Sequence, residues 1–414
     1  METTLKVAGI DIHKKMLAVV MTDASQTDEL SFERRTFGTG DQDLRDLAAW
    51  LSEQGVQQVV MESTAQYWRP VWQCLEPVSR LHLAQAQSNR APKGRKRDFA
   101  DAERLVRRFL AGELILSFVP DAQQRLWRTL TRSKYQLTRD RVRLRNQMEG
   151  LLEEARIKLS SHVSDLFGVS GRKMLQALAE GVSEPQQIAA LAVTGLRATP
   201  EALADALSGA VSMDALQRNV LRLFLERLDL LERHIETLRQ SAAQALREHQ
   251  EAVARLAEVP GLGADSAHQI IAEVGPQAAA FPSAGQLASW VGCCPGREES
   301  AQVSKSDQSP KGSRHMRHIL SQCANAAVKT KGSIFQQQYQ RLVNRIGHPK
   351  AIWAVAHKLC RIIWKILYER VPYEERGYRT DANAIRRRAG KLVRQLRQLG
   401  FQVQLTTASS IPLT

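Results

Sequence analysis

Apolar residues in the first part of the chain come in short runs that are separated by polar stretches. These runs predict β-strands over residues 5–11, 16–22, 31–37, 56–61 and 81–86. Apolar residues at helical spacing predict helices over residues 44–51 and 67–75. The predicted order is therefore strand, strand, strand, helix, strand, helix, strand. Such an order predicts a mixed sheet flanked by helices, which is an α/β domain.

From residue 90 onward the apolar positions follow the period of a helix. They predict a helix over residues 98–112 and one long amphipathic helix over residues 121–157. A second seam runs from Leu221 to Ala252, and its heptad-like spacing predicts an antiparallel helical hairpin or an intersubunit coiled coil. Short helices interrupted by Gly and Pro are predicted over residues 160–215, and an apolar-rich helix over residues 349–371.

A glycine-rich segment over residues 259–275 has the pattern of a helix–hairpin–helix element. Gly261 and Gly263 allow a tight turn whose backbone N–H groups open the next helix. Such groups bind phosphate without reading the base sequence. The alternative is an ordinary glycine-rich turn between two helices. The polar, serine-rich residues 295–315 are predicted to form a long loop.

The composition is that of a globular protein. Of 414 residues, 43% are hydrophobic and 24% are charged, which argues against a mostly disordered chain. The chain has no apolar run of about 18 residues and no N-terminal signal pattern, so neither a membrane span nor secretion is expected. The odd number of cysteines, five, argues against a disulfide framework, and the absence of a CxxC pair argues against a structural zinc site. We therefore expect a reducing, cytoplasmic location.

The net charge of +15 is the first indication of function. Such an excess of cations predicts a polyanionic partner, most simply nucleic acid, and the alternative is a basic surface without a specific partner. Basic residues gather around residues 90–108, 125–145 and 311–318 and again beyond residue 375, with few acids between them in the second group. The candidate nucleic-acid-binding residues are Lys93, Arg95, Lys96, Arg97, Arg128, Arg132, Arg139, Arg143, Gly261, Gly263, Lys311, Arg314 and Arg317.

Four acidic residues stand where a metal centre could form. Asp11 closes the first predicted strand and Glu62 closes the fourth, while Asp98 and Asp101 share one face of a predicted helix. Carboxylate oxygens are the ligands that Mg²⁺ prefers, and a pair of such ions can stabilise both oxygens of a phosphoryl transfer. Each acid also has a purely structural alternative, such as a helix cap, a first-turn acid or an exposed strand end.

A nucleophile is harder to identify from the residues alone. Ser300 lies in the polar segment ahead of three further serines, Ser304, Ser306 and Ser309. Loop serines are usually solvated, and spacing gives Ser300 no priority over Ser304.

Several motifs together resemble the DEDD transposases of insertion-sequence family 110. They are Gly9-Ile10-Asp11, residues 61–68, residues 94–103, residues 259–263, residues 281–288, and Gly292 with Pro295. The likeness covers most of residues 5–372 in the same order. In the second motif the family usually has Ala and Gly where this chain has Ser63 and Ala65.

This resemblance implies an RNase H-like (RuvC-like) mixed-sheet domain, long coiled-coil helices and a mostly helical C-terminal domain with a helix–hairpin–helix element. The implied boundaries are 1–120, 121–258, 259–372 and a basic appendage at 373–414. It also implies that Asp11, Glu62, Asp98 and Asp101 bind Mg²⁺ and that Ser300 is the catalytic serine.

The activity implied by the resemblance is the excision and insertion of a mobile element. A structured bridge RNA would pair with donor and target DNA, and strand exchange would pass through a phosphoserine. The active site would combine the acids of one subunit with the serine of another in a homo-tetramer, a dimer of dimers. Two alternatives remain, a metal-dependent nuclease of the junction-resolving type and a non-catalytic nucleic-acid-binding protein.

Overall fold

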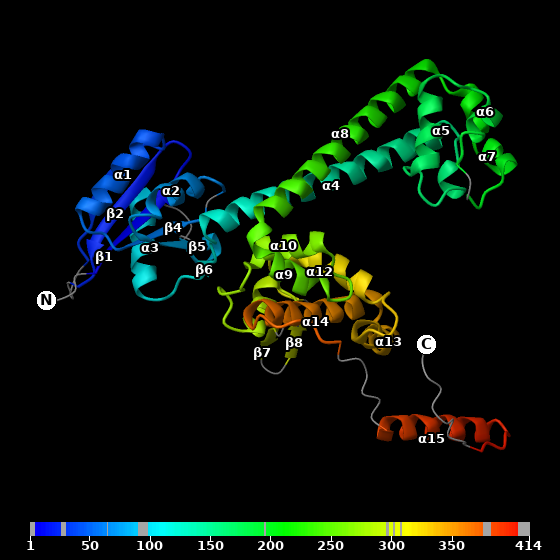
Figure 1. Ribbon diagram of the computed structural model, residues 1–414. Helices are drawn as coiled ribbons and strands as arrows, with labels where there is room; N and C mark the ends of the chain where they lie inside the picture. The colour runs from blue at the N-terminus through cyan, green and yellow to red at the C-terminus, as the bar shows by residue number, and fades with distance from the viewer. Residues whose placement is uncertain are drawn as a thin grey trace. The chain divides into compact units, whose positions relative to one another are not determined.

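The computed structural model describes residues 5–25, 30–63, 65–89, 98–193, 196–294, 298–300, 303–306, 309–375 and 382–404. The chain divides into two compact units, Met1–Arg125 and Leu126–Thr414, and each is described by itself (Figure 1). The finer division predicted from the sequence stays a prediction. No helix in the described ranges is both long and apolar enough to cross a membrane.

The described part of the first unit contains one mixed sheet of six strands in the order β3-β2-β1-β4-β5-β6. The strands are β1 (Lys6–Ile12), β2 (Leu17–Asp23), β3 (Glu33–Phe37), β4 (Gln58–Glu62), β5 (Arg80–Ala84) and β6 (Leu116–Ser117). β4 is parallel to β1 and β5, whereas the other pairings are antiparallel. The predicted mixed sheet is confirmed. The two-residue strand β6 was not predicted, because so short a strand has no alternation to recognise.

Helices cover both faces of this sheet. They are α1 (Asp41–Glu53), α2 (Trp68–Leu75), the 3₁₀ helix η1 (Ala86–Asn89) and α3 (Asp98–Leu110). Because strand residues alternate between faces, Ile10 and Met61 pack with α1 and α2. Val7 and Val60 lie on the opposite face and pack against α3. The three α-helices confirm those predicted near residues 44–51, 67–75 and 98–112.

Two long helices run side by side in opposite directions in the second unit (Figure 1). They are α4 (Ala122–Glu154), of which residues 126–154 belong to this unit, and α8 (Ala215–Ala245). Their buried seams include Leu144 and Met148 on α4 and Leu221 and Leu228 on α8. This pairing within one chain corresponds to the antiparallel alternative of the two predicted, and the intersubunit coiled coil stays a prediction.

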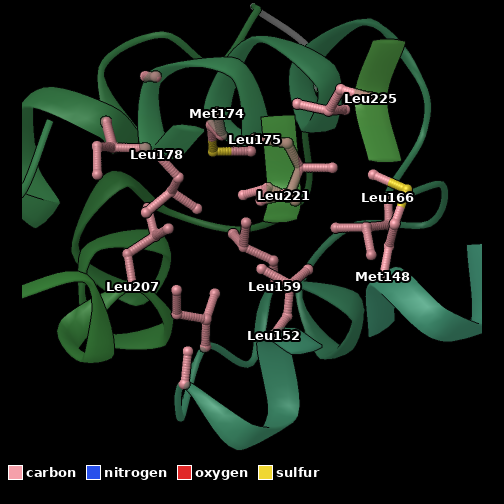
Figure 2. Packing of buried hydrophobic residues seen from close by; sticks show 14 of the residues in the cluster. Met148, Leu152, Leu159, Leu166, Met174, Leu175, Leu178, Leu207, Leu221 and Leu225 are labelled. Carbon is pink, nitrogen blue, oxygen red and sulfur yellow. The ribbon is translucent and has the colours of Figure 1, made fainter. Parts of the chain in front are cut away.

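Short helices close the far end of this pair, as predicted for residues 160–215. They are η2 (Leu159–Ser161), α5 (Val169–Ala179), α6 (Pro185–Ala189), α7 (Pro200–Ala206) and η3 (Ser208–Ser212). Their leucines and methionines interlock with those of α4 and α8 (Figure 2). This region therefore has an apolar core of its own, which stabilises the tip of the helical pair.

The second seam, from Leu221 to Ala252, is not one continuous helix. α8 ends at Ala245, and the chain continues through η4 (Arg247–His249) into α9 (Gln250–Ala257). Leu246 leaves helical geometry with φ −101° and ψ 14°, and its side chain is fully buried. Burial of this apolar side chain stabilises the break, so no Gly or Pro marks it in the sequence.

The remaining helices are α10 (Ala264–Val274), α11 (Ala284–Val291), α12 (Arg314–Ala327), α13 (Ile334–Ile346), α14 (His348–Tyr368) and α15 (Ala382–Gln398). The apolar helix α14 confirms the one predicted near residues 349–371 and packs against α9, α11, α12 and α13. The loop predicted over residues 295–315 is wrong in part, because β7 (Glu298–Ser300) and β8 (Val303–Ser306) pair within it. Main-chain bonds form this hairpin from polar residues, which give no alternating apolar pattern.

Candidate metal centre and basic surfaces

Strand alternation brings Asp11 and Glu62 to the same face of the sheet. Ile10 is paired with Met61 in the parallel register of β1 and β4, and both point toward α1 and α2. The next residues, Asp11 and Glu62, therefore face α3. Both stand at the carboxyl ends of parallel strands, where polar residues can gather without breaking the core.

Gly9 allows α3 to approach β1 closely enough to complete the site. A Cβ atom at this position would lie 2.5 Å from the carbonyl oxygen of Ala102. The helix backbone can thus rest on the strand, and its first turn brings Asp98 and Asp101 near Asp11. Burial raises the pKa of Asp11, the two neighbouring carboxylates raise it further, and His13 lowers it.

His13 joins this group, although the sequence analysis did not select it. Its Nε2 atom lies 3.1 Å from Oδ2 of Asp11 and 3.2 Å from Oδ1 of Asp98. One donor atom from each of the three residues lies within 4.8 Å of the other two. The signal that could have identified His13 is its place two residues after Asp11, because this spacing puts two side chains on the same side of an extended chain.

The other two acids are held by neighbours. Oε2 of Glu62 accepts a hydrogen bond of 2.9 Å from Nδ2 of Asn89, whose side chain is buried. Among the described residues, Oδ1 of Asn89 has no hydrogen-bond partner. Asp101 forms an ion pair of 2.6 Å with Arg104. These contacts orient the two carboxylates before any ligand binds.

The residues of this group fit a divalent cation. The donors are carboxylate oxygens and one imidazole, which are suitable ligands for such an ion. Burial is the main cause of the raised pKa of Asp11, and the smaller contribution from repulsion by Asp101 and Asp98 is the interaction that a cation would relieve. The structure brings Asp11, Asp98 and Asp101 together and sets Glu62 beside Asp11 in the strand register.

Ser300 is the last residue of β7 and pairs with Val303 in the antiparallel hairpin. The base of the segment that carries it is closely packed. Gly292 has φ +72°, and a Cβ there would lie 2.4 Å from the carbonyl oxygen of Pro310. The guanidinium of Arg317 donates to the carbonyls of Gly292 and Pro310 and lies 4.4 Å from the ring of Trp353. Arg317, a candidate for nucleic-acid binding, is thus engaged within the fold.

The first basic turns of α4 also have partners inside the protein. Arg128 donates to the carbonyls of Ala272 and Glu273, at 3.2 and 2.5 Å. Arg132 makes a two-pronged ion pair with Glu273, at 2.8 and 2.9 Å, and that glutamate is only 1% exposed. These two arginines fasten α4 to α10, so we do not retain them as nucleic-acid contacts.

Further along, the basic candidates are accessible. Arg139 and Arg143 on α4 are exposed, and so are Lys311 and Arg314 before and at the start of α12. Arg143 forms an ion pair with Asp140 that is open to solvent. The remaining basic candidates, Lys93, Arg95, Lys96 and Arg97, lie outside the described residues.

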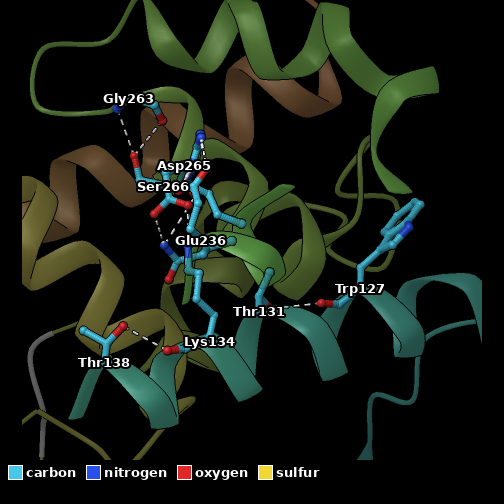
Figure 3. Close-up of polar contacts among 10 residues, drawn as sticks. Trp127, Thr131, Lys134, Thr138, Glu236, Gly263, Asp265 and Ser266 are labelled. Carbon is cyan, nitrogen blue, oxygen red and sulfur yellow. Dashed lines mark hydrogen bonds and ion pairs between the residues drawn. The ribbon is translucent and has the colours of Figure 1, made fainter. Parts of the chain in front are cut away.

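The glycine-rich turn between α9 and α10 is used for packing. Gly261 has φ +85°, and a Cβ there would lie 2.4 Å from the carbonyl oxygen of Cys323 on α12. The N–H of Gly263 donates to Oγ of Ser266 at 2.9 Å (Figure 3). Lys134 of α4 reaches Asp265 in the first turn of α10. Phosphate binding at this turn stays a prediction, and the Gly263 donor already has an acceptor.

Comparison with known proteins gives matches in both units. Residues 8–157, which contain all four acids, match a family model of IS110 DEDD transposases. Residues 253–340 match the model described as the transposase IS116/IS110/IS902 family. A protein from Pseudomonas aeruginosa, described as a probable family 20 transposase, is 27% identical over 293 residues, which cover 68% of this chain and 75% of that protein.

Proposed function

The chain belongs to the IS110 family of DEDD transposases, enzymes that cut and rejoin DNA, and we propose that Asp11, Glu62, Asp98 and Asp101 form its metal centre. The observation that carries this proposal is the gathering of acids on the α3 face of the sheet around the half-buried Asp11. A DEDD domain implies dependence on a divalent metal, and Mg²⁺ is the ion we propose.

The residues of the centre are oriented in advance for this task. Asn89 holds Glu62 and Arg104 holds Asp101, while Asp11 is fixed in the middle of the sheet. Preformed carboxylates lose little conformational freedom when a ligand binds. When bound, Mg²⁺ would stabilise negative charge on the oxygens around the reacting phosphorus.

We further propose that Ser300 is the nucleophile. Its Oγ would attack the phosphorus of a DNA phosphodiester, and the bond from phosphorus to the departing deoxyribose oxygen would break. The hydroxyl proton passes to solvent, and the departing oxygen takes up a proton. Attack by a DNA hydroxyl on the phosphoserine then releases the serine and restores the phosphodiester. Support comes from the family and from the closely packed base of the segment that carries Ser300.

DNA is the substrate class of this family, and we propose a structured bridge RNA as a second nucleic-acid partner and a homo-tetramer as the assembly. The charge of +15 and the exposed Arg139, Arg143, Lys311 and Arg314 support a surface that follows phosphate backbones. If the RNA recognises the DNA sequence by base pairing, the protein needs to contact only the backbone of the nucleic acid and to recognise its shape.

The test is a cleavage reaction with the purified protein, its element-derived RNA, Mg²⁺ and end-labelled donor and target DNA. We expect a DNA species that shifts on a denaturing gel and is lost after protease treatment. Asp11→Asn should abolish cleavage, and Ser300→Ala should abolish the protease-sensitive species, with Ser304→Ala as the matched control.

Other outcomes would favour the alternatives. Cleavage with free ends and no protein–DNA species would indicate the nuclease. A protease-sensitive species that is lost in Ser304→Ala and kept in Ser300→Ala would identify Ser304 as the nucleophile. Binding of DNA and RNA without any cleavage would indicate a non-catalytic protein.

A further inference from the structure

We infer that His13 is a nitrogen ligand of the metal centre, so that the centre binds first-row transition-metal ions more tightly than Mg²⁺, the ion proposed for the reaction. This inference rests on the proposed function, because it concerns the same site. It adds a fifth residue to the four acids and assigns that residue a chemical consequence.

The distances between the donor atoms suit an ion held among them. Nε2 of His13 lies 3.1 Å from Oδ2 of Asp11 and 3.2 Å from Oδ1 of Asp98. An octahedral ion with ligands at about 2.0–2.1 Å separates neighbouring ligand atoms by about 2.9 Å. The observed separations are close to that value, so the three side chains could bind one ion with small adjustments.

The position of His13 is fixed by the backbone. It follows β1 at the start of the turn to β2, and its N–H donates to the carbonyl of Met16 at 3.0 Å. The hydroxyl of Thr39 donates to the carbonyl of Lys14 in the same turn, at 3.1 Å. The imidazole therefore projects from a defined turn, and its side chain is 47% exposed, which leaves it open to an incoming ion.

Imidazole changes the choice of metal. Mg²⁺ prefers oxygen ligands and keeps much of its water, whereas transition-metal ions bind nitrogen well. A centre with one imidazole should therefore discriminate more strongly against Mg²⁺ than a centre of carboxylates alone. The competing interpretation is that His13 is a cationic partner of Asp11 and Asp98 and never contacts the metal.

The experiment uses Mn²⁺ alone with the full-length protein, and pulsed electron paramagnetic resonance as the readout. A bound imidazole gives a ¹⁴N modulation of the Mn²⁺ signal, which changes to the ¹⁵N pattern when the histidines are ¹⁵N-labelled. This measurement on the unaltered protein does not depend on the folding of any variant. We expect the modulation in the wild-type protein and its loss in His13→Gln, with the exposed His234→Gln as the matched control.

Calorimetric titration adds a second readout. In His13→Gln we expect Mn²⁺ affinity to fall about tenfold or more, since even outer partners of metal ligands cost that much, and Mg²⁺ affinity to change less. Mn²⁺ bound without a ¹⁴N signal, or a signal unchanged in His13→Gln, would overturn the inference and leave the acidic centre standing. Absence of Mn²⁺ binding, or equal binding in Asp11→Asn, would overturn the proposed centre itself.

Discussion

Replacing Glu273 with glutamine should loosen the attachment of α4 to α10. The carboxylate side chain is 2% exposed and faces Arg132 at 2.8 Å and Arg128 at 3.5 Å. Glutamine keeps the shape of the side chain but removes the charge. Two guanidinium groups would then share one neutral acceptor in a buried position. Removing only one partner of a buried ion pair is strongly destabilising, because it leaves the other charge buried without compensation.

The size of the expected loss of stability depends on which hydrogen-bond partners each arginine keeps. Removing one partner of a buried pair costs about 3–5 kcal/mol. Arg128 keeps its two carbonyl acceptors, and the Arg132 side chain is 34% exposed and can turn to water. We therefore expect a loss of about 2–3 kcal/mol in the free energy of unfolding, which is at or below the lower limit of that range. For a unit of this size the thermal midpoint should fall on the order of 5–10 °C.

Thermal unfolding of the full-length protein, together with hydrogen exchange in peptides from α4 and α10, measures this change. Glu236→Gln is the matched control, because Glu236 on α8 is solvent-exposed and pairs with Arg239 on its own helix. The control should leave the midpoint and the exchange of both helices unchanged. A loss below about 1 kcal/mol in Glu273→Gln would refute the view that this carboxylate holds the two helices together.

Five further substitutions have expected outcomes. Arg143→Gln should lower the slope of log affinity for DNA against log salt by about 0.9, whereas Arg132→Gln should lower stability with the slope unchanged. Gly9→Val should unfold the first unit or shift α3 in a thermal melt, because a Cβ there meets the helix backbone. Ala65→Gly should stabilise the protein by about 1 kcal/mol in urea denaturation, because Ala65 has φ +46°. Asp11→Asn should raise the thermal midpoint of the chelator-treated protein at neutral pH. The raised pKa means that ionised Asp11 opposes folding above that pKa, and a lower midpoint would contradict this.

The sequence predicted best what depends on local periodicity. Strands β1 to β5 of the first unit and the helices α1, α3, α4 and α14 appear where apolar spacing indicated them, because one buried face imposes the same period on sequence and structure. The break at Leu246 and the hairpin of β7 and β8 were missed, since burial of one leucine and main-chain pairing leave no such period.

In the candidate site, too, features that follow from local rules could be predicted, whereas contacts between distant parts of the chain could not. Asp11 and Glu62 could be placed together from strand ends alone, because register and alternation are local rules. The role of Arg132 could not be deduced, because its partner Glu273 lies 141 residues away along the chain. A cluster of arginines on one helix indicates nucleic-acid binding only when no acid from a distant part of the chain packs against it. Whether such an acid is present is decided by the tertiary structure and cannot be deduced from the local sequence.

The closely packed base of the segment between Gly292 and Gly312 has a consequence for its tolerance to change. A Cβ on Gly312 would lie 2.3 Å from the backbone of Val291, and Ser313 donates its N–H to the carbonyl of Trp290. The two ends of the segment are thus joined independently of what lies between them. The entropic cost of closing the loop then depends only weakly on its length. Doubling the length of the segment would cost about 0.6 kcal/mol. Insertions or exchanges of sequence near Ser300 can therefore accumulate while the helices beneath remain folded.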